Sequence, residues 1–286
     1  MRTMLRKSFV VFIAGLALAG SAQAETGPEM RLAVAPINHH DNASLQRGAR
    51  TFVNYCLGCH SAQSMRFNRL ETDLGLTERQ IAENFVFRGA LGKDGYVSDK
   101  VGETMKTSMD RAEAKEWFGV IPPDLTVEAR VRGADWLYAY FRGYYRDDKT
   151  ATGWNNLMFP NVAMPHVLWE AGGQNKLTVR EFESHEEAIG AYMQTHAVAA
   201  LETLHVNKDG KETAKYVLRI VEADKPGTIS AVDYDILVTD LVNYLEYMAE
   251  PVRNERIQIG IKVLIFLAAL FAFAYWTKRE YWKDVH

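Results

Sequence analysis

One pentapeptide constrains this chain more than any other feature: Cys56-Leu57-Gly58-Cys59-His60, which contains both of its cysteines. Two cysteines separated by two residues and followed by histidine have the spacing that covalent haem attachment requires, because the thiols add to the two vinyl groups of the porphyrin. The adjacent histidine then lies under the iron as an axial ligand. We therefore expect a fold organised around one haem c, held by Cys56 and Cys59 and ligated by His60.

Two other chemistries also use closely spaced cysteines. A thiol–disulfide oxidoreductase needs its cysteine pair at the N-terminus of a helix in a βαβ unit. Here the apolar spacing from Leu45 to Cys56 predicts a helix that ends at the first cysteine. A structural zinc site would need a second cysteine pair, which the sequence lacks. Haem is favoured, and an anchored thiol oxidoreductase is the alternative from a different class.

The composition and the N-terminus describe an exported globular protein. Of the 286 residues 48% are hydrophobic and 24% charged, and a net charge of −3 argues against nucleic acid as a partner. Residues 1–24 have a basic start, an apolar run from Phe9 to Ala19 and a cleavage site at Ala22-Gln23-Ala24, which predicts a signal peptide. The mature chain would begin at Glu25, with 30 basic and 36 acidic residues and a net charge of −6.

A second apolar run lies near the C-terminus, from Ile257 to Trp276. At about 1.5 Å per residue its 20 residues match the roughly 30 Å hydrocarbon core of a bilayer. We predict a transmembrane helix over 257–276 and a cytoplasmic tail over 277–286. The haem domain, over 25–252, would lie on the periplasmic side of the inner membrane.

Between these ends the patterns predict a mostly α chain with a small β insertion. Helices are expected at 45–56, 77–88, 110–118, 135–145 and 232–248. Thr77 and Gln80 form a capping box at the start of the second helix, and Asp135 is the expected N-cap of the fourth. Alternation around Asn-Lys-Asp-Gly predicts a β-hairpin over 204–221. Frequent Gly, Asn and Pro predict a long irregular loop over 146–179.

The sixth position of a histidine-ligated haem can be filled by a second side chain. Met164 is the leading candidate, because it lies in the irregular loop and Pro165 stiffens the backbone beside it. A single methionine is just as often core filler. The alternatives that the residues leave open are Met158, Met105 and Met109. A bis-histidine haem would instead use one of His39, His40, His166, His185, His196 and His205.

Haem propionates would bring negative charge into a partly buried pocket, so basic side chains should face them. Arg130 and Arg132 are the candidates, since they follow the Pro122–Thr126 segment and precede an aromatic segment. The same charges would equally suit a solvated turn. The aromatic side chains that would wall the porphyrin, or simply form core, are Trp136, Tyr138, Tyr140, Tyr144 and Tyr145.

At this point the chain resembles the cytochrome c1 family in its bacterial form. The resemblance covers most of the predicted mature chain. Its motifs are Leu45-Gln46-Arg47-Gly48, Cys56-Leu57-Gly58-Cys59-His60, Pro122-Pro123-Asp124-Leu125-Thr126, Arg132-Gly133-Ala134-Asp135-Trp136-Leu137-Tyr138, Asn155-Asn156, Phe159-Pro160, Ala163-Met164-Pro165 and Met248-Ala249-Glu250-Pro251.

The resemblance implies a class I cytochrome c-like haem domain with long loops, a small β-hairpin insertion and one C-terminal transmembrane helix. It also implies that His60 and Met164 are the axial ligands. The residues that it places at the haem are Cys56, Cys59, His60, Met164, Pro122, Pro123 and one of the two arginines, with Arg132 preferred to Arg130.

The family is the haem subunit of the quinol–cytochrome c oxidoreductase, the cytochrome bc1 complex. The resemblance therefore implies an electron carrier, not an enzyme on its own, that accepts electrons from a Rieske iron–sulfur protein and passes them to a cytochrome c. The partners it implies are cytochrome b, the Rieske protein, a soluble or anchored cytochrome c and the bilayer, within a dimeric complex. An anchored monohaem cytochrome serving another respiratory complex is the alternative. The acidic stretch 181–187 would steer a basic partner or form a solvated helix start.

Overall fold

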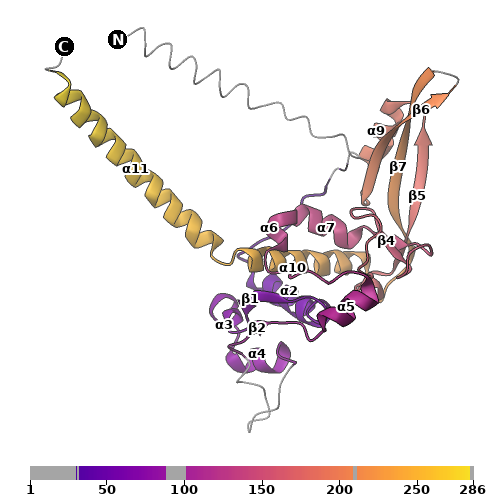
Figure 1. Cartoon of the computed structure of the whole chain (residues 1–286), viewed down its shortest axis with the longest axis horizontal. Helices are drawn as coiled ribbons and strands as arrows, with labels where there is room; N and C mark the ends of the chain where they lie inside the picture. Colours follow the sequence, from indigo (N-terminus) through magenta and orange to yellow (C-terminus); the bar gives the residue numbers. More distant parts are fainter. Residues whose placement is uncertain (1–29, 31, 88–100, 209–210, 284–286) are drawn as a thin grey trace. The chain divides into compact units, whose positions relative to one another are not determined.

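The computed structural model describes residues 30, 32–87, 101–208 and 211–283 (Figure 1). The predicted signal peptide lies outside the described residues. The chain divides into two compact units. The described residues of the larger unit are 32–87, 101–178 and 220–283, and those of the smaller unit are 30, 179–208 and 211–219.

Two helices from distant parts of the chain form the core of the larger unit. α2 (Asn42–Tyr55) buries an apolar stripe with Phe52 at its centre, on the face that the sequence periodicity predicts. α10 (Ala231–Ala249) lies between α2 on one side and α6 (Glu128–Arg132) and α7 (Ala134–Arg142) on the other (Figure 1). The core therefore joins the haem motif, at the end of α2, to the helix that precedes the predicted anchor.

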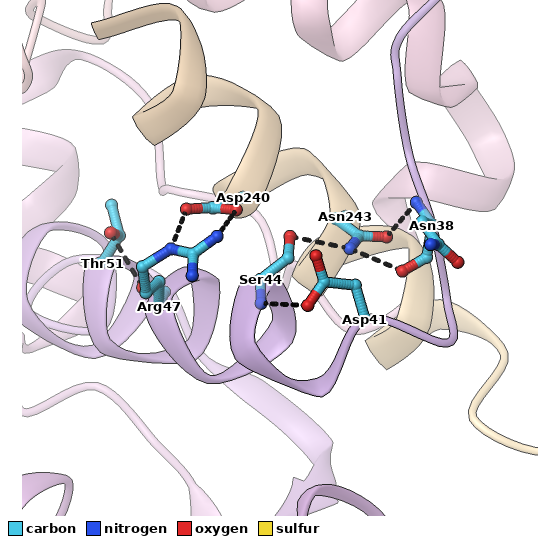
Figure 2. Close-up of polar contacts among 7 residues, drawn as sticks. All are labelled: Asn38, Asp41, Ser44, Arg47, Thr51, Asp240 and Asn243. Atoms are coloured by element: carbon cyan, nitrogen blue, oxygen red, sulfur yellow. Dashed lines mark hydrogen bonds and ion pairs between the residues drawn. The ribbon is translucent and has the colours of Figure 1, made fainter. Parts of the chain in front are cut away.

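An ion pair joins α2 to α10 where the two helices cross. Arg47 donates two hydrogen bonds to the carboxylate of Asp240, at 2.6 and 2.9 Å (Figure 2). The next residue, Gly48, lies where the helices approach most closely, because a methyl group there would overlap the carbonyl oxygen of Asp240. Only glycine permits this approach without a shift of the helices.

A second polar cluster closes the start of α2. Asp41 caps the helix by accepting a hydrogen bond from the Ser44 amide at 3.0 Å. The side-chain amide of Asn243, on α10, donates to the Ser44 hydroxyl and to the Asn38 carbonyl, both at 2.9 Å (Figure 2). The segment that leads into α2 is thus tied to the same helix that packs across it.

The five predicted helices are present: the first and the last are slightly longer than predicted, and the other three are shorter. The Thr77–Gln80 capping box is present, with both reciprocal hydrogen bonds, and Asp110 caps the following helix through two backbone amides. The remaining short helices of the larger unit are α3 (Arg69–Leu74), α4 (Glu78–Asn84), α5 (Arg111–Phe118) and α8 (Trp169–Gly172). A two-stranded pair, β1 (Ala62–Arg66) with β2 (Thr104–Met105), lies beside them.

The aromatic helix differs from its prediction at both ends. Asp135 is not its N-cap: the preceding Gly133 has no capping side chain, and the Asp135 carboxylate accepts a hydrogen bond from the distant Ala35 amide at 2.7 Å. The helix ends at Arg142, and β3 (Tyr144–Arg146) begins where the prediction still had helix. β3 pairs antiparallel with β4 (Trp154–Asn156).

The predicted irregular loop over 146–179 is therefore only partly irregular. Besides β4 and α8 it contains the start of β5 (Gln174–Phe182). β5 belongs to a three-stranded sheet with β6 (Ala199–Lys208) and β7 (Lys211–Lys225), in the order β5-β7-β6. The expected hairpin thus has a third strand, and its turn at 209–210 lies outside the described residues. Within the smaller unit, α9 (His185–Gln194) packs against β6.

The C-terminal helix has the length and composition to cross a membrane. α10 ends at Ala249, two residues before Pro251, and α11 (Arg253–Tyr281) follows. α11 covers the whole predicted span of 257–276, and its large apolar side chains are exposed. An exposed apolar helix of this length is what a bilayer anchor requires.

Candidate functional site

The haem motif forms a tight turn at the C-terminal end of α2. The Cys56 amide still donates to the Phe52 carbonyl at 2.8 Å, so the first cysteine closes the helix. The amides of Cys59 and His60 then both donate to the Cys56 carbonyl, at 3.0 and 2.8 Å. The turn thus brings both thiols and the imidazole to one end of α2, as the sequence predicts.

His60 is held as a neutral imidazole with one defined ring nitrogen available. The ring is buried, and its Nδ1 lies 2.8 Å from the carbonyl oxygen of Pro123. Nδ1 therefore carries the proton and donates it, which leaves the Nε2 lone pair for a metal. Burial lowers the pKa of His60, and the Pro123 carbonyl opposes that shift. A neutral histidine with an oriented ring is the form in which imidazole ligates iron.

Backbone and side-chain hydrogen bonds fix the Pro122–Thr126 segment against the chain that follows His60. The Leu125 amide donates to the Ser61 carbonyl at 2.8 Å, and the Asp124 carboxylate accepts from the Gln63 amide at 2.8 Å. These contacts explain why a two-proline segment accompanies the haem motif: it presents a rigid carbonyl, that of Pro123, to the histidine. Pro122 lines a cavity of about 330 Å³ together with Cys59.

The thiols are unsuited to disulfide exchange. Cys56 is buried, and burial is the main reason that its pKa rises to about 12; burial also raises the pKa of Cys59. Redox-active cysteines depend on a lowered pKa, usually at a helix N-terminus. Here the pair lies at a helix C-terminus, and this geometry argues against the thiol oxidoreductase.

The structure separates the candidate methionines. Met105 is fully buried and its sulfur accepts a hydrogen bond from the Tyr244 hydroxyl at 3.5 Å, which makes it a core residue. Met158 is also buried in the core. Met109 lines the cavity next to Cys59, and Met164 is half-buried. Met164 and Met109 therefore stay candidates, whereas Met105 and Met158 do not.

Two asparagines shape the loop that carries Met164. The Asn156 side chain is fully buried; it donates to the Tyr140 carbonyl at 2.8 Å and accepts from the Met158 amide at 2.8 Å. The Asn155 side chain accepts from the amides of Asn156 and Asn161, both at 2.8 Å. Asn161 has a left-handed backbone, with φ of 61°. The two asparagines, at the end of β4, thus hold the irregular turn that follows them.

Met164 lies beside two tyrosine hydroxyls from α7 and β3. The hydroxyl of Tyr140 donates to its sulfur at 3.5 Å, and that of Tyr144 donates to its carbonyl oxygen at 3.3 Å. The two hydroxyls are 2.6 Å apart. The sequence places both tyrosines on an aromatic segment, but no local signal shows that they meet a residue twenty or more positions away.

The predicted aromatic wall divides into two groups. The rings of Trp136 and Tyr140 are stacked at 5.0 Å, and that of Tyr144 is stacked on His166 at 4.7 Å. Tyr138 belongs to the other group, because its hydroxyl contacts the Asp235 carboxylate on α10 at 2.8 Å. Tyr140 and Tyr144 therefore contact Met164, and Trp136 is stacked on Tyr140, whereas Tyr138 is a core contact.

Both candidate arginines are exposed on α6, and they differ in their partners. Arg132 forms an ion pair with Glu128 at 3.0 Å, and its guanidinium lies over the rings of Trp136 and Phe159, at 4.8 and 5.7 Å. Arg130 has no ion pair within 4.0 Å among the described residues. The structure thus places Arg132 in the aromatic row that leads to Met164, whereas Arg130 lies near the carboxylates of Glu246 and Glu250 at the end of α10.

Comparison with known proteins identifies the family of the chain. The model of the cytochrome c1 family matches residues 33–181 and 225–285. The chain is 41% identical to a cytochrome c1 of Allochromatium vinosum, over 95% of this chain and 96% of that protein. It is also 41% identical to a protein named ammonia monooxygenase gamma subunit from Nitrosomonas europaea, over 91% and 92%. The mitochondrial cytochrome c1 haem protein of Saccharomyces cerevisiae is 24% identical, over 87% and 70%.

Proposed function

We propose, because the chain belongs to the cytochrome c1 family, that it carries electrons in a bacterial cytochrome bc1 complex. In this proposal it takes electrons from a Rieske iron–sulfur protein and passes them to a soluble or anchored cytochrome c. It acts as an electron-carrying subunit of a quinol–cytochrome c reductase and has no catalytic residue of its own.

Members of this family carry one covalently attached haem c, whose iron gains and loses one electron. The residues present fit that group. Both cysteines are free thiols, and the buried His60 is fixed by the Pro123 carbonyl so that Nε2 is the ligating nitrogen. Apolar side chains of Ile121 and Val127, on the segment around Pro123, are exposed as an apolar macrocycle would need. The His60–Pro123 contact beside the two thiols is the observation that carries the proposal.

In the proposed site each of these residues has a defined task. Cys56 and Cys59 bind the porphyrin, His60 ligates the iron from one side and Met164 from the other. Pro122 and Pro123 orient the histidine side, and the Asn155–Asn156 turn positions the methionine loop. A propionate is bound by Arg130 or Arg132. The resemblance prefers Arg132, but Arg132 already forms an ion pair with Glu128, which makes Arg130 the better candidate.

The chain is anchored in a membrane by α11. We propose that residues 1–24 direct export and that the haem domain lies on the periplasmic side of the inner membrane, with 277–286 as the cytoplasmic tail. The exposed apolar surface of α11 would pack against cytochrome b and lipid, within a dimeric complex.

The ligand assignment is tested by paired substitutions in the full-length protein. Met164→Leu removes the proposed sulfur ligand, so the ferrous haem should bind carbon monoxide and the midpoint potential should fall, since methionine ligation raises it. Met109→Leu is the matched control and should change neither property. Carbon monoxide binding by Met109→Leu but not by Met164→Leu would reverse the assignment.

The name of the Nitrosomonas relative supports a second candidate: an anchored monohaem subunit of another oxidoreductase complex. Purification in mild detergent distinguishes the two. We expect cytochrome b and an iron–sulfur protein to co-purify with this chain, and added quinol to reduce its haem in that preparation. Co-purification with a different oxidase, and no reduction by quinol, would refute the bc1 proposal and support the second candidate.

A further inference from the structure

Two tyrosine hydroxyls contact Met164 at two different atoms. The Tyr140 hydroxyl, on α7, lies 3.5 Å from the sulfur, and the Tyr144 hydroxyl, on β3, lies 3.3 Å from the backbone carbonyl oxygen. The hydroxyls also contact each other at 2.6 Å, and either of them can be the donor of that bond. The thioether and its two neighbours therefore form one small network.

This network has fewer protons than acceptors. Each hydroxyl can donate one proton, and the acceptors are the Met164 sulfur, the Met164 carbonyl and the oxygen of the other tyrosine. In one arrangement Tyr140 donates to the sulfur and Tyr144 donates to Tyr140. In the other, Tyr144 donates to the carbonyl and Tyr140 donates to Tyr144. Rotation of two hydroxyl groups interconverts them without movement of any heavy atom.

Stacked aromatic rings hold both tyrosines in place. Trp136 is stacked on the Tyr140 ring at 5.0 Å, and His166 is stacked on the Tyr144 ring at 4.7 Å. Inside a partly dry site such hydrogen bonds are stronger than in water.

We propose that Tyr140 is a positioning residue that sets the reduction potential by its hydrogen bond to the Met164 sulfur, with Tyr144 as its alternative acceptor. The inference rests on the proposed ligation of iron by Met164. With haem bound, a donor at the sulfur would withdraw electron density from the thioether lone pairs and so favour the ferrous form. The Tyr144 oxygen offers the Tyr140 proton a second acceptor wherever the sulfur is the poorer one.

The test compares three tyrosine variants of the full-length protein in detergent, with the midpoint potential as the readout. Tyr140→Phe removes the donor to the sulfur. We expect the equilibrium constant for reduction to fall about threefold, which corresponds to a potential about 30 mV lower, because tenfold is 59 mV for one electron. Tyr144→Phe removes the neighbouring hydroxyl but retains the donor to the sulfur, so its potential should change less.

Tyr138→Phe is the matched control on the same helix, because its hydroxyl contacts Asp235 instead of Met164. It should leave the potential unchanged. Equal shifts in Tyr140→Phe and Tyr144→Phe, or an unchanged potential in Tyr140→Phe, would overturn the inference. Met164→Leu distinguishes a failure of this inference from a failure of the proposed ligand assignment. If Met164→Leu changes the haem spectrum while Tyr140→Phe leaves the potential unchanged, Met164 is the ligand and Tyr140 does not set the potential. If Met164→Leu also changes nothing, the ligand assignment itself is wrong.

Discussion

Replacing Arg47 by alanine should destabilise the protein more than replacing its partner Asp240. The Asp240 side chain is only 6% exposed, whereas that of Arg47 is 55% exposed. Without Arg47, the carboxylate stays buried without the two hydrogen bonds that compensate for its loss of water. Without Asp240, the guanidinium can turn into solvent. The two members of the pair therefore differ in solvent exposure: Asp240 is buried, whereas Arg47 is exposed.

The magnitudes follow from this difference in exposure. Breaking a buried pair costs about 3–5 kcal/mol and an exposed pair about 0.2–1 kcal/mol. We expect about 3 kcal/mol for Arg47→Ala, about 2 kcal/mol for Asp240→Ala and a coupling free energy of about 1.5 kcal/mol between them. For a chain of this size, 3 kcal/mol corresponds to a Tm lower by about 6–12 °C.

The assay is thermal unfolding of the full-length protein in detergent, followed by the haem absorbance, for both single variants and the double variant. Arg50→Ala, an exposed arginine on the same helix, is the control and should change the free energy of unfolding by less than about 0.5 kcal/mol. The reasoning is refuted if Asp240→Ala costs as much as Arg47→Ala, or if the coupling is below about 0.5 kcal/mol.

Three further predictions concern the helix crossing, the methionine loop and the docking of partners. Gly48→Ala should lower the free energy of unfolding by about 3 kcal/mol, because the added methyl group overlaps the Asp240 carbonyl; a neutral result in denaturant titration would mean that the helices can separate. Asn156→Ala should cost about 2–3 kcal/mol and let the ferrous haem bind carbon monoxide, since the Tyr140 carbonyl and two amides of the loop lose their partner. Stability loss without carbon monoxide binding would mean that Asn156 does not position the methionine ligand. Electron transfer to a basic cytochrome c should slow as ionic strength rises, given the net charge of −6 after removal of 1–24. A rate independent of salt would exclude steering by charge. Substitution of Glu186 and Glu187 tests whether α9 contributes to it.

The parts of the fold that local signals determine were predictable. The Thr77–Gln80 capping box, the Asp110 cap and the end of α2 at the first cysteine each depend on residues within one helical turn. Asp135 shows the limit of such signals. It has the sequence of an N-cap, but its carboxylate binds the Ala35 amide, one hundred positions away, and no local pattern contains that partner.

The strands outside the predicted hairpin were missed for the same reason. Tyr144–Arg146 continues an apolar helical pattern, yet it pairs with Trp154–Asn156, and β5 pairs with β7 across the 28 residues of chain between them. Pairing between strands depends on contacts that periodicity within one segment does not encode.

The candidate site likewise contains some residues that local sequence signals identify and others that only long-range contacts show. The spacing of Cys56, Cys59 and His60 identifies the cofactor directly. The Pro123 carbonyl that orients the histidine is 63 positions away, and the tyrosines at Met164 are twenty and twenty-four positions away. The choice between Arg130 and Arg132 depends on local partners of Arg132, Glu128 and Trp136, each four positions away, and on the Phe159 ring, which only the structure places beside Arg132.

Near-infrared magnetic circular dichroism of the ferric, full-length protein tests the central claim most directly, since it distinguishes sulfur from nitrogen as an axial ligand of low-spin haem. The account predicts the charge-transfer band of histidine–methionine ligation, present in the wild-type protein and lost in Met164→Leu. A bis-histidine band, a high-spin signal, or a methionine band that survives in Met164→Leu would contradict it.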